Sequence, residues 1–375
     1  MLSAIIGRHL MTGLSRPDAR YRTTRALRPL LVSITCLAGG LMMHPGTDAQ
    51  IHQGLTAVEG IKVGHHTLTA RPTGCTVILV EAGAVAGVDV RGGAPATRET
   101  DLLDPSKSIQ EIHAVVLSGG SAFGLDSAGG VMRYLSERDI GVDMRVARVP
   151  IVPGAAIYDL PVGDDPTIRP TAECGYQAAT VATTGPVAEG NVGVGAGATI
   201  GKTRGAGRAM KGGVGSASVT LPGGLIVAAL VAVNAVGDVV DPATGQVVAG
   251  VRTEDGQRLA DARVLLRSGG GRPGRGRENT TLGVVATNAR LTQAQATAVA
   301  QMAHDGFARA IAPSHTPSDG DTIFALATGA LSESPRLGAI GPLAADVMGE
   351  AIVRAARAAT GIPGYPSARD LRAGQ

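Results

Sequence analysis

Aromatic side chains are scarce in this 375-residue chain, which has no tryptophan, five tyrosines and three phenylalanines. Proteins that bind single-stranded nucleic acid stack the bases on aromatic rings. This scarcity and a net charge of only +3 therefore disfavour a general nucleic-acid partner. The core must be built from Ala, Val, Leu and Ile, and 54 glycines spread along the chain indicate many tight turns and close backbone approaches.

Metal-binding and nucleophile-elbow motifs are also missing. The eight histidines are scattered, His65 and His66 form the one close pair, and no zinc-ligand spacing is present. No Gly-x-Ser-x-Gly sequence surrounds a suitable serine. We therefore expect neither a metal nor a cofactor. A Ser-His-Asp triad assembled from distant residues, with His304 or His315 as base, stays open but has no local signature.

Cysteine occurs at three positions, and the N-terminal 49 residues, which contain Cys36, have the composition of a secretory signal. Five arginines between residues 16 and 28 precede an apolar run from residue 29 to 43, and small residues precede a candidate cleavage position after Ala49. The run is too short and too glycine-rich for a good membrane span. Export to the periplasm or secretion is the prediction. An anchor helix, or a mis-assigned start site and a cytoplasmic protein, are the alternatives.

After removal of such a signal, Cys75 and Cys174 would remain. These two thiols could pair in an oxidising compartment. Two unpaired cysteines at unrelated positions are an equally good interpretation.

The body of the chain alternates strand-like and helix-like segments without an internal repeat. Residues 114–139 predict a strand, a glycine turn and a helix with Ser121 near its start. Residues 223–241 predict a hairpin that turns at 234–238. Further on we expect a strand over 281–287, a helix opened by Thr292, a strand around 322–328 and a final helix from about Pro342, with proline in its first position, to Ala358. This order fits an α+β layered domain.

The sequence RENTTLGVVATNAR at residues 277–290 joins two unlike segments. Upstream, residues 267–277 form a flexible Arg/Gly linker, and downstream a buried strand follows. A cut between Asn279 and Thr280 would give Thr280 a free α-amine, whose reference pKa is about 8. That amine can deprotonate the Thr280 hydroxyl and create a nucleophile without any histidine. The linker would let the peptide bend so that this hydroxyl attacks the Asn279 carbonyl.

Two further segments are candidates for binding. Residues 193–203 nearly match a phosphate-binding loop, but Ala196 replaces a required glycine and no clear helix follows Lys202, so nucleotide binding is disfavoured. Lys202 can approach a substrate closely among its glycines; an exposed surface lysine is the alternative. Asp319 and Asp321 precede a strand, where two close carboxylates could bind a cation or couple to a hydroxyl or amine. An ordinary acidic turn is the alternative.

Several motifs, taken in order from about Gly54 to Gly361, resemble the P1 peptidase family of L-aminopeptidase/D-esterases, β-peptidyl aminopeptidases and nylon-oligomer hydrolases. They are LSGGSAFGLDSAGGV, AAIYDL, GAGATIGK, KGGVGSAS, NAVGDVVD, ENTTLGVVATNA and SDGDTIFALAT. The resemblance implies an αββα sandwich of the N-terminal-nucleophile type that cuts itself into two subunits. Residues 50–279 would form the α subunit and 280–375 the β subunit of one catalytic domain, and the subunits would stay together.

The resemblance also implies site residues. Thr280 matches the nucleophile, with Asn279 before the cut, and the family's oxyanion asparagine, active-site tyrosine and lysine match Asn234, Tyr158 and Lys202. Threonine at the nucleophile position is more similar to the nylon-oligomer hydrolases. So is the Asp-Gly-Asp sequence at 319–321, where many β-aminopeptidases carry Ser-x-Glu, and this departure weakens the case for β-peptide specificity.

Each implied role has a chemical reason. Asn234 can donate an N–H group to an oxyanion, an effect of roughly 2.7–4 kcal/mol per donor. Asp319 and Asp321 can orient the Thr280 ammonium and hydroxyl and accept a substrate amine. Lys202 can polarise the hydroxyl or bind a substrate carboxylate. Free backbone N–H groups at a helix start favour anions. On this ground the substrate-binding candidates are Gly119, Gly120 and Ser121.

The sequence therefore predicts an exported, self-processing N-terminal threonine aminopeptidase or amidohydrolase for amides, esters or short oligomers that carry a free amine. The alternatives are an acyltransferase of the ornithine-acetyltransferase type and a non-enzymatic periplasmic binding protein. The expected partners are a small amide or short-peptide substrate and the protein's own α and β fragments, with no nucleic acid. The resemblance further implies a homo-oligomer, specifically a tetramer.

Overall fold

The computed structural model describes residues 54–269, 279–331 and 337–373. The predicted signal segment, 1–49, and most of the predicted linker, 267–277, lie outside these ranges, so both stay predictions. Within the described ranges, no helix combines the length and the apolar character needed to cross a membrane.

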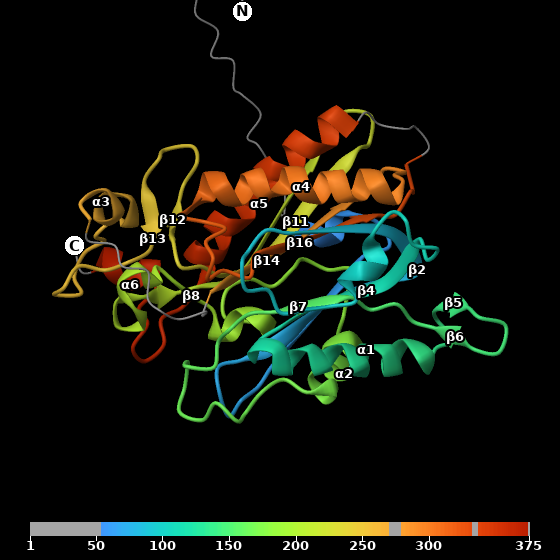
Figure 1. Ribbon diagram of the computed structural model, residues 1–375, viewed down its shortest axis with the longest axis horizontal. Helices are drawn as coiled ribbons and strands as arrows, with labels where there is room; N and C mark the ends of the chain where they lie inside the picture. The colour runs from blue at the N-terminus through green and yellow to red at the C-terminus, as the bar shows by residue number, and fades with distance from the viewer. Residues whose placement is uncertain (1–53, 270–278, 332–336, 374–375) are drawn as a thin grey trace, which may run out of the picture. The chain divides into compact units, whose positions relative to one another are not determined.

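Nine strands form the main sheet, hydrogen-bonded in the order β10-β11-β14-β16-β2-β4-β7-β3, with β1 beside β2 (Figure 1). Their bounds are β1 Lys62–Thr67, β2 Gly74–Val90, β3 Thr97–Arg98, β4 Glu111–Ser118, β7 Gly154–Ala156, β10 Gly213–Thr220, β11 Ile226–Asn234, β14 Thr280–Thr287 and β16 Thr322–Ala327. The long strand β2 belongs to both halves of this sheet. Its first part pairs with β1 and β4, its last part pairs with β16, and its register shifts between Leu79 and Ala84.

The alternation of side chains along the strands assigns the faces of the sheet to separate apolar layers. In β11, the odd-numbered residues from Val227 to Val233 pack with α4 (Gln293–Ala310) and α5 (Leu337–Ala358). The even-numbered residues from Ala228 to Ala232 pack in a second cluster that also contains residues of β4. The two halves of the sheet therefore face one another across this second cluster.

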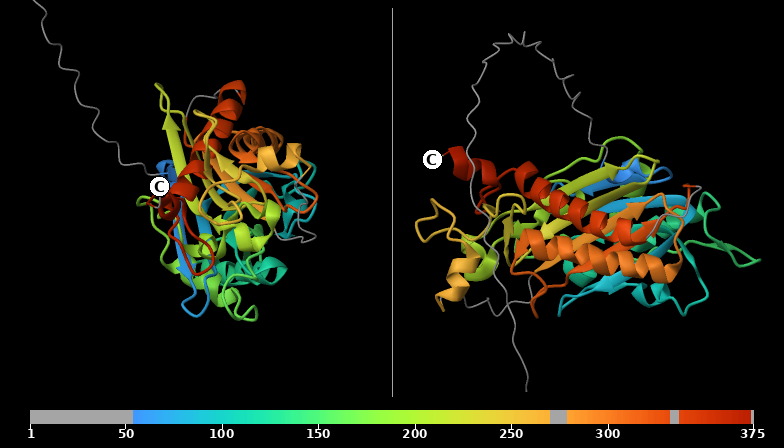
Figure 2. Two further views of the ribbon diagram at one scale, coloured as in Figure 1. Left: turned by 90° about the vertical axis from the view of Figure 1, so that its left-hand side faces the viewer. Right: turned by 90° about the horizontal axis from the view of Figure 1, so that it is seen from above.

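A third apolar cluster covers the opposite half of the sheet. Val77 and Leu79 of β2 pack there with α1 (Ser127–Ser136) and α2 (Ala172–Thr180). Figures 1 and 2 show α4 and α5 side by side on one outer face and α1 and α2 on the other. The predicted α+β class and the αββα sandwich are confirmed.

Several local predictions are confirmed as well. β14 and β16 occupy the two predicted strand positions, and a 3-10 helix, η3 (Ser121–Asp126), leads into α1. Thr292 caps α4 in a capping box, because its hydroxyl accepts the Gln295 N–H while the Gln295 side chain accepts the Thr292 N–H.

Two local predictions are wrong. The expected hairpin does not form, because β12 (Asp238–Val240) pairs with β13 (Val247–Ala249) and β15 (Ile311–Ala312) in a separate three-stranded sheet. A local apolar pattern shows that strands exist but not which strands pair. Helix α5 begins at Leu337, so Pro342 lies inside it rather than at its first position. The long buried face of α5 outweighs the loss of one N–H donor at this proline.

Cys75 at the start of β2 and Cys174 in α2 form a disulfide, which decides between the two interpretations of these cysteines. Both residues are buried within the apolar cluster that lies beneath α1 and α2. The bond therefore ties α2 to the main sheet.

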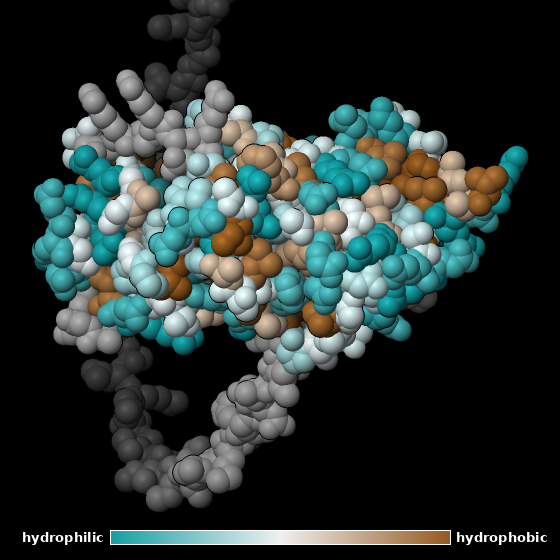
Figure 3. Space-filling view, turned by 90° about the horizontal axis from the view of Figure 1, so that it is seen from below, coloured by the Kyte–Doolittle hydropathy of each residue, from teal (hydrophilic) through white to brown (hydrophobic). Residues whose placement is uncertain are grey.

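The hairpin of β5 (Val142–Asp143) and β6 (Arg148–Val149) protrudes from the body (Figure 1). Val146 and Met144 on it are 95% and 53% exposed. Seen from below, hydrophobic residues gather toward the end of the molecule at which this hairpin protrudes (Figure 3). The predicted homo-oligomer stays a prediction.

Candidate active site

The ends of three strands meet at one edge of the sheet. β11 and β14 are antiparallel, with Asn234 opposite Thr280. β14 and β16 are parallel, with Leu282 opposite Thr322. In the same register, toward the N-terminus of both strands, an isolated bridge pairs Asn279 with Asp319. The predicted cleavage peptide therefore lies directly beside the Asp-Gly-Asp sequence.

The strand alternation also fixes the direction of the two opposed side chains. Even-numbered residues of β14 and β11, such as Leu282 and Ala232, belong to the apolar layer between the halves of the sheet. Thr280 and Asn234 continue these two series and so face the same layer. They are 3% and 0% exposed. A reaction at Thr280 would therefore take place at the edge of a nearly water-free layer.

The carbonyl oxygen of Asn279 accepts two hydrogen bonds. The Thr280 hydroxyl donates to it with an Oγ1–O distance of 2.5 Å, and the Gly320 N–H donates at 2.8 Å. When a nucleophile adds to a carbonyl, its oxygen becomes negative, and a fixed N–H beside it stabilises that charge. A hydroxyl group and a backbone N–H donor thus both contact one peptide group.

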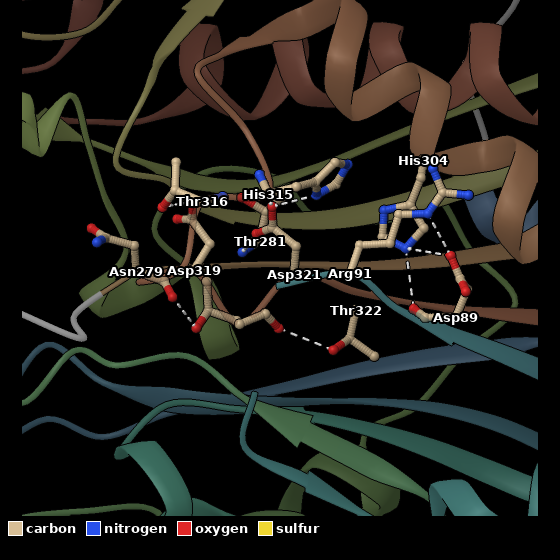
Figure 4. Close-up of polar contacts among 12 residues, drawn as sticks. Asp89, Arg91, Asn279, Thr281, His304, His315, Thr316, Asp319, Asp321 and Thr322 are labelled. Atoms are coloured by element: carbon tan, nitrogen blue, oxygen red, sulfur yellow. Dashed lines mark hydrogen bonds and ion pairs between the residues drawn. The ribbon is translucent and has the colours of Figure 1, made fainter. Parts of the chain in front are cut away.

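Asp321 holds the backbone on the other side of Thr280. Its Oδ1 accepts the Thr281 N–H at 2.8 Å. Its Oδ2 accepts the His315 N–H at 3.0 Å and lies 2.9 Å from Nδ1 of the His315 ring (Figure 4). Asp321 is only 2% exposed, so these three hydrogen bonds from the protein take the place of solvent.

Asp319 has fewer partners. Its Oδ2 accepts the N–H of Thr316 at 2.8 Å and the hydroxyl of the same residue at 2.6 Å (Figure 4). Its Oδ1 is buried and has no hydrogen-bond partner among the described residues. Burial, and next the negative charge of Asp321, raise the pKa of Asp319 to about 6, although the Thr316 hydrogen bonds and the charge of Lys202 act in the opposite direction. A carboxyl group that titrates near neutral pH can exchange protons during a reaction.

Asn234, Lys202 and Tyr158 form one connected group. Lys202 Nζ donates to Asn234 Oδ1 at 2.7 Å, to the Asn234 carbonyl at 3.0 Å and to Thr199 Oγ1 at 3.1 Å. Asn234 Nδ2 donates to the Tyr158 carbonyl at 3.1 Å. Lys202 is only 7% exposed, so the alternative of an exposed surface lysine is wrong. Tyr158 and Lys202 also line a small pocket together with Tyr365.

A buried ion pair fixes the loop that carries Tyr158. The Arg71 guanidinium contacts Asp159 Oδ1 at 3.0 Å, and both side chains are fully buried. Asp159 also accepts the Thr73 hydroxyl at 2.6 Å and the Gly120 N–H at 2.8 Å. This pair therefore connects the Tyr158 loop to the glycine turn before α1.

The expectation of free N–H groups at that glycine turn is wrong. The N–H groups of Gly119, Gly120 and Ser121 donate to the Gly74 carbonyl, the Asp159 carboxylate and the Ile157 carbonyl, all at 2.8–2.9 Å. Buried backbone donors find protein partners wherever these are available. A substrate-binding role for this turn stays a prediction and would have to use atoms other than these three backbone N–H groups.

Cofactor and metal sites were not predicted from the sequence. Across the described ranges, no group of three or more His, Cys, Asp or Glu side chains is placed to hold a metal ion. Lys202 begins the short 3-10 turn η5 (Lys202–Arg204), and a second one, η6 (Ala206–Arg208), follows it.

Sequence reasoning missed two parts of the site. It treated Gly320 as a spacer, yet a Cβ at this position would lie 2.7 Å from Thr280 Oγ1, so glycine lets the two backbones approach. It considered His315 only as the base of a triad, yet His315 contacts Asp321. An Asp-Gly-Asp sequence that begins a strand parallel to β14 could have indicated the first contact. No local signal indicates the second.

The chain is similar to known proteins over most of its length. The model of peptidase family S58 matches residues 53–369. An uncharacterized aminopeptidase of Mycobacterium tuberculosis is 45% identical over 347 residues, which cover 84% of this chain and 97% of that protein. A 6-aminohexanoate-oligomer endohydrolase of Kocuria sp. is 31% identical over 319 residues, which cover 80% and 84%.

A solved structure shares the fold. The L-aminopeptidase D-Ala-esterase/amidase of Ochrobactrum anthropi, described as a variant of the Ntn hydrolase fold, aligns with a TM-score of 0.61 and 22% identity. The alignment covers 86% of this chain and 93% of that one. The predicted resemblance to the P1 peptidases is confirmed.

Replacement of Asp319 by Asn should stabilise the intact chain at pH 8 but not at pH 4. The folded-state pKa of Asp319, about 6, lies above its ordinary value of 3.8. The contribution of Asp319 to the free energy of unfolding of the wild type is therefore fully present below pH 4 and is lost as the pH rises through 6. The Asn variant should gain about 3 kcal/mol at pH 8. Urea unfolding in a Thr280→Ala background measures this, and a gain that is equal at both pH values would contradict it.

Proposed function

The chain belongs to peptidase family S58 and is a hydrolase of peptide or amide bonds; from this premise we propose that it cuts its own Asn279–Thr280 peptide and then uses Thr280 as an N-terminal nucleophile. Its substrates would be small amides, esters or short oligomers with a free amine. The family match goes against both alternatives, the acyltransferase and the non-enzymatic binding protein.

One observation carries the self-cleavage. The Thr280 hydroxyl and the Gly320 N–H both contact the carbonyl oxygen of Asn279, at 2.5 and 2.8 Å. In the proposed reaction, Thr280 Oγ1 bonds to the carbonyl carbon and the bond from that carbon to the Thr280 nitrogen breaks. The nitrogen gains the proton that the hydroxyl loses. Water then hydrolyses the resulting ester and leaves a carboxylate on Asn279.

The freed amine would serve as the base in later turnovers. An α-amine has a pKa of about 8, so it can accept the proton of its own hydroxyl near neutral pH. The adjacent carboxylates of Asp319 and Asp321 supply negative charge that favours an ammonium group nearby. This arrangement supports a nucleophile that needs no histidine.

Asn234 is suited to stabilise the oxyanion of a substrate. A side-chain amide has two N–H donors, and one of those of Asn234 bonds to the Tyr158 carbonyl. Lys202 occupies the Asn234 Oδ1 atom, so the orientation of the amide group is fixed. The second N–H can then serve a substrate on the layer that Asn234 shares with Thr280.

The strand order supports fragments that stay together. β14 and β16 lie in the middle of the sheet, between β11 and β2. β11 and β2 precede the proposed cut, whereas β14 and β16 follow it. Two long runs of backbone hydrogen bonds therefore join the proposed fragments.

We also propose that the protein is exported. The proposal rests on the basic and apolar composition of residues 1–49. The Cys75–Cys174 disulfide supports it, because disulfides persist in oxidising compartments.

Purified wild-type protein should separate into two fragments, the smaller of which begins at Thr280. Thr280→Ala should stay intact, because it has no hydroxyl. Gly320→Ala should cut at least about 100-fold more slowly, since its Cβ displaces Thr280 Oγ1. Gly129→Ala is the matched control, because a Cβ there meets nothing within 4 Å. Intact-mass measurements and N-terminal sequencing decide; wild-type protein that stays uncut after long incubation contradicts the proposal.

Free-amine substrates should react faster than their N-acetylated counterparts. A charge-assisted hydrogen bond to Asp319 or Asp321 contributes about 1.5–3 kcal/mol, so acetylation should lower kcat/KM by roughly tenfold or more. A panel of D- and L-amino-acid amides, β-peptides and 6-aminohexanoate oligomers, each with and without acetylation, measures this on wild-type enzyme. Equal rates within each pair would show that the two carboxylates serve Thr280 alone.

A further inference from the structure

His315 has no role in the reaction proposed above, yet its conformation is unusual. Its φ is +55°, in the left-handed region that few residues other than glycine adopt. This conformation directs both the backbone N–H and the ring Nδ1 of His315 to one atom, Oδ2 of Asp321, at 3.0 and 2.9 Å. A backbone held in a sparsely populated region is a reason to look for a function.

The surroundings of the His315 ring favour one tautomer. Nδ1 must carry the proton if it is to donate to a carboxylate. Nε2 is buried without a partner among the described residues, and a lone pair there is less costly than an unpaired N–H or a charged ring. Phe307 stacks on the ring with centroids 5.8 Å apart and so restricts its orientation. The ring of His315 is therefore held with Nδ1 as a donor to Asp321.

A second histidine lies behind the first. The ring centroids of His304 and His315 are 4.8 Å apart, and His304 Nε2 lies 3.1 Å from the Asp89 carbonyl (Figure 4). Burial lowers the pKa of His304 to about 4, so this ring is neutral near pH 7. The Asp89 carboxylate lies 3.5 Å from His304 and is paired with Arg91 at 2.7 Å. The charges behind His315 therefore compensate one another.

The two acids of the site accept different numbers of hydrogen bonds. Asp321 receives three donors: the Thr281 N–H, and from His315 the N–H and the ring. Asp319 receives two, both on Oδ2, and faces the positive charge of Lys202 at longer range. Two adjacent buried carboxyl groups resist ionising together. Asp319, the acid that accepts fewer hydrogen bonds, is therefore the one that takes up the proton.

We propose that His315 is a positioning residue that acts through Asp321: its two donors hold the Asp321 carboxylate, so that Asp319 is the acid that exchanges protons beside Thr280. This inference rests on the proposed self-cleavage. Loss of the ring donor would let Asp321 compete for the proton. The pair would then bind its proton more tightly, and the reaction would lose activity at a higher pH than in the wild type.

Two substitutions at residue 315 separate this role from a structural one. His315→Ala removes the ring donor. His315→Asn keeps an N–H close to the position of Nδ1, and Asn tolerates a positive φ. The cleavage rate of purified precursor is followed by intact mass between pH 4.5 and 8. The acid limb is the range in which the cleavage rate falls as the pH is lowered. For the Ala variant, its midpoint should lie about one pH unit above that of the wild type. The Asn variant should keep the wild-type limb.

Several results would overturn the inference. One is an Ala variant that is slower by the same factor at every pH, as a structural role would produce. Another is an Asn variant whose acid limb moves as far as that of the Ala variant. In either case a wild-type chain that cuts itself leaves the proposed function standing. A wild-type chain that never cuts overturns the proposed function and the inference together.

A second measurement needs neither cleavage nor a change at residue 315. In the uncut Thr280→Ala protein, nitrogen NMR of labelled histidines reports which ring nitrogen of His315 is protonated. The expected result is a ring that carries a proton on Nδ1. A proton on Nε2 alone would overturn the inference even if the Ala variant at position 315 fails to fold.

Discussion

The parallel pairing of β14 with β16 is the constraint on which the site depends. Its register sets Asn279 beside Asp319, and Gly320 beside Thr280, so one glycine N–H reaches the Asn279 carbonyl. The antiparallel pairing of β14 with β11 then places Asn234 on the same face as Thr280. Thr280, the Asn279 carbonyl, the Gly320 N–H and Asn234 thus meet at the end of β11 and at the starts of β14 and β16.

The same register brings two carboxyl groups into a buried place, where their charges repel. Hydrogen bonds from Thr281, His315 and Thr316 offset part of this cost. The rest remains as the raised pKa of Asp319. Such a site lowers the stability of the intact chain, as active sites commonly do. An ammonium group on Thr280, formed by the proposed cut, would relieve the repulsion, so the cut chain would be electrostatically better matched to its site than the precursor.

Local elements of the fold could be predicted from the sequence, because β14, β16 and the Thr292 cap each follow from short-range patterns. The pairing of β12 and the start of α5 could not, since both depend on tertiary contacts. For the site, the physics of an N-terminal threonine indicated Thr280, the glycine-rich context indicated Lys202, and family resemblance supplied Asn234 and Tyr158. The roles of Gly320 and His315 required the structure, because they arise from register and from one left-handed residue.

The central claim is that Thr280 Oγ1 attacks the Asn279 carbonyl and forms an ester. Hydroxylamine added to freshly purified precursor would intercept that ester, since it cleaves esters much faster than peptides. Mass spectrometry of the larger fragment should then find a hydroxamate on the carbonyl of Asn279, and the smaller fragment should begin with an unmodified Thr280. A chain that remains whole in hydroxylamine, or one that is cut at another bond, would contradict the account.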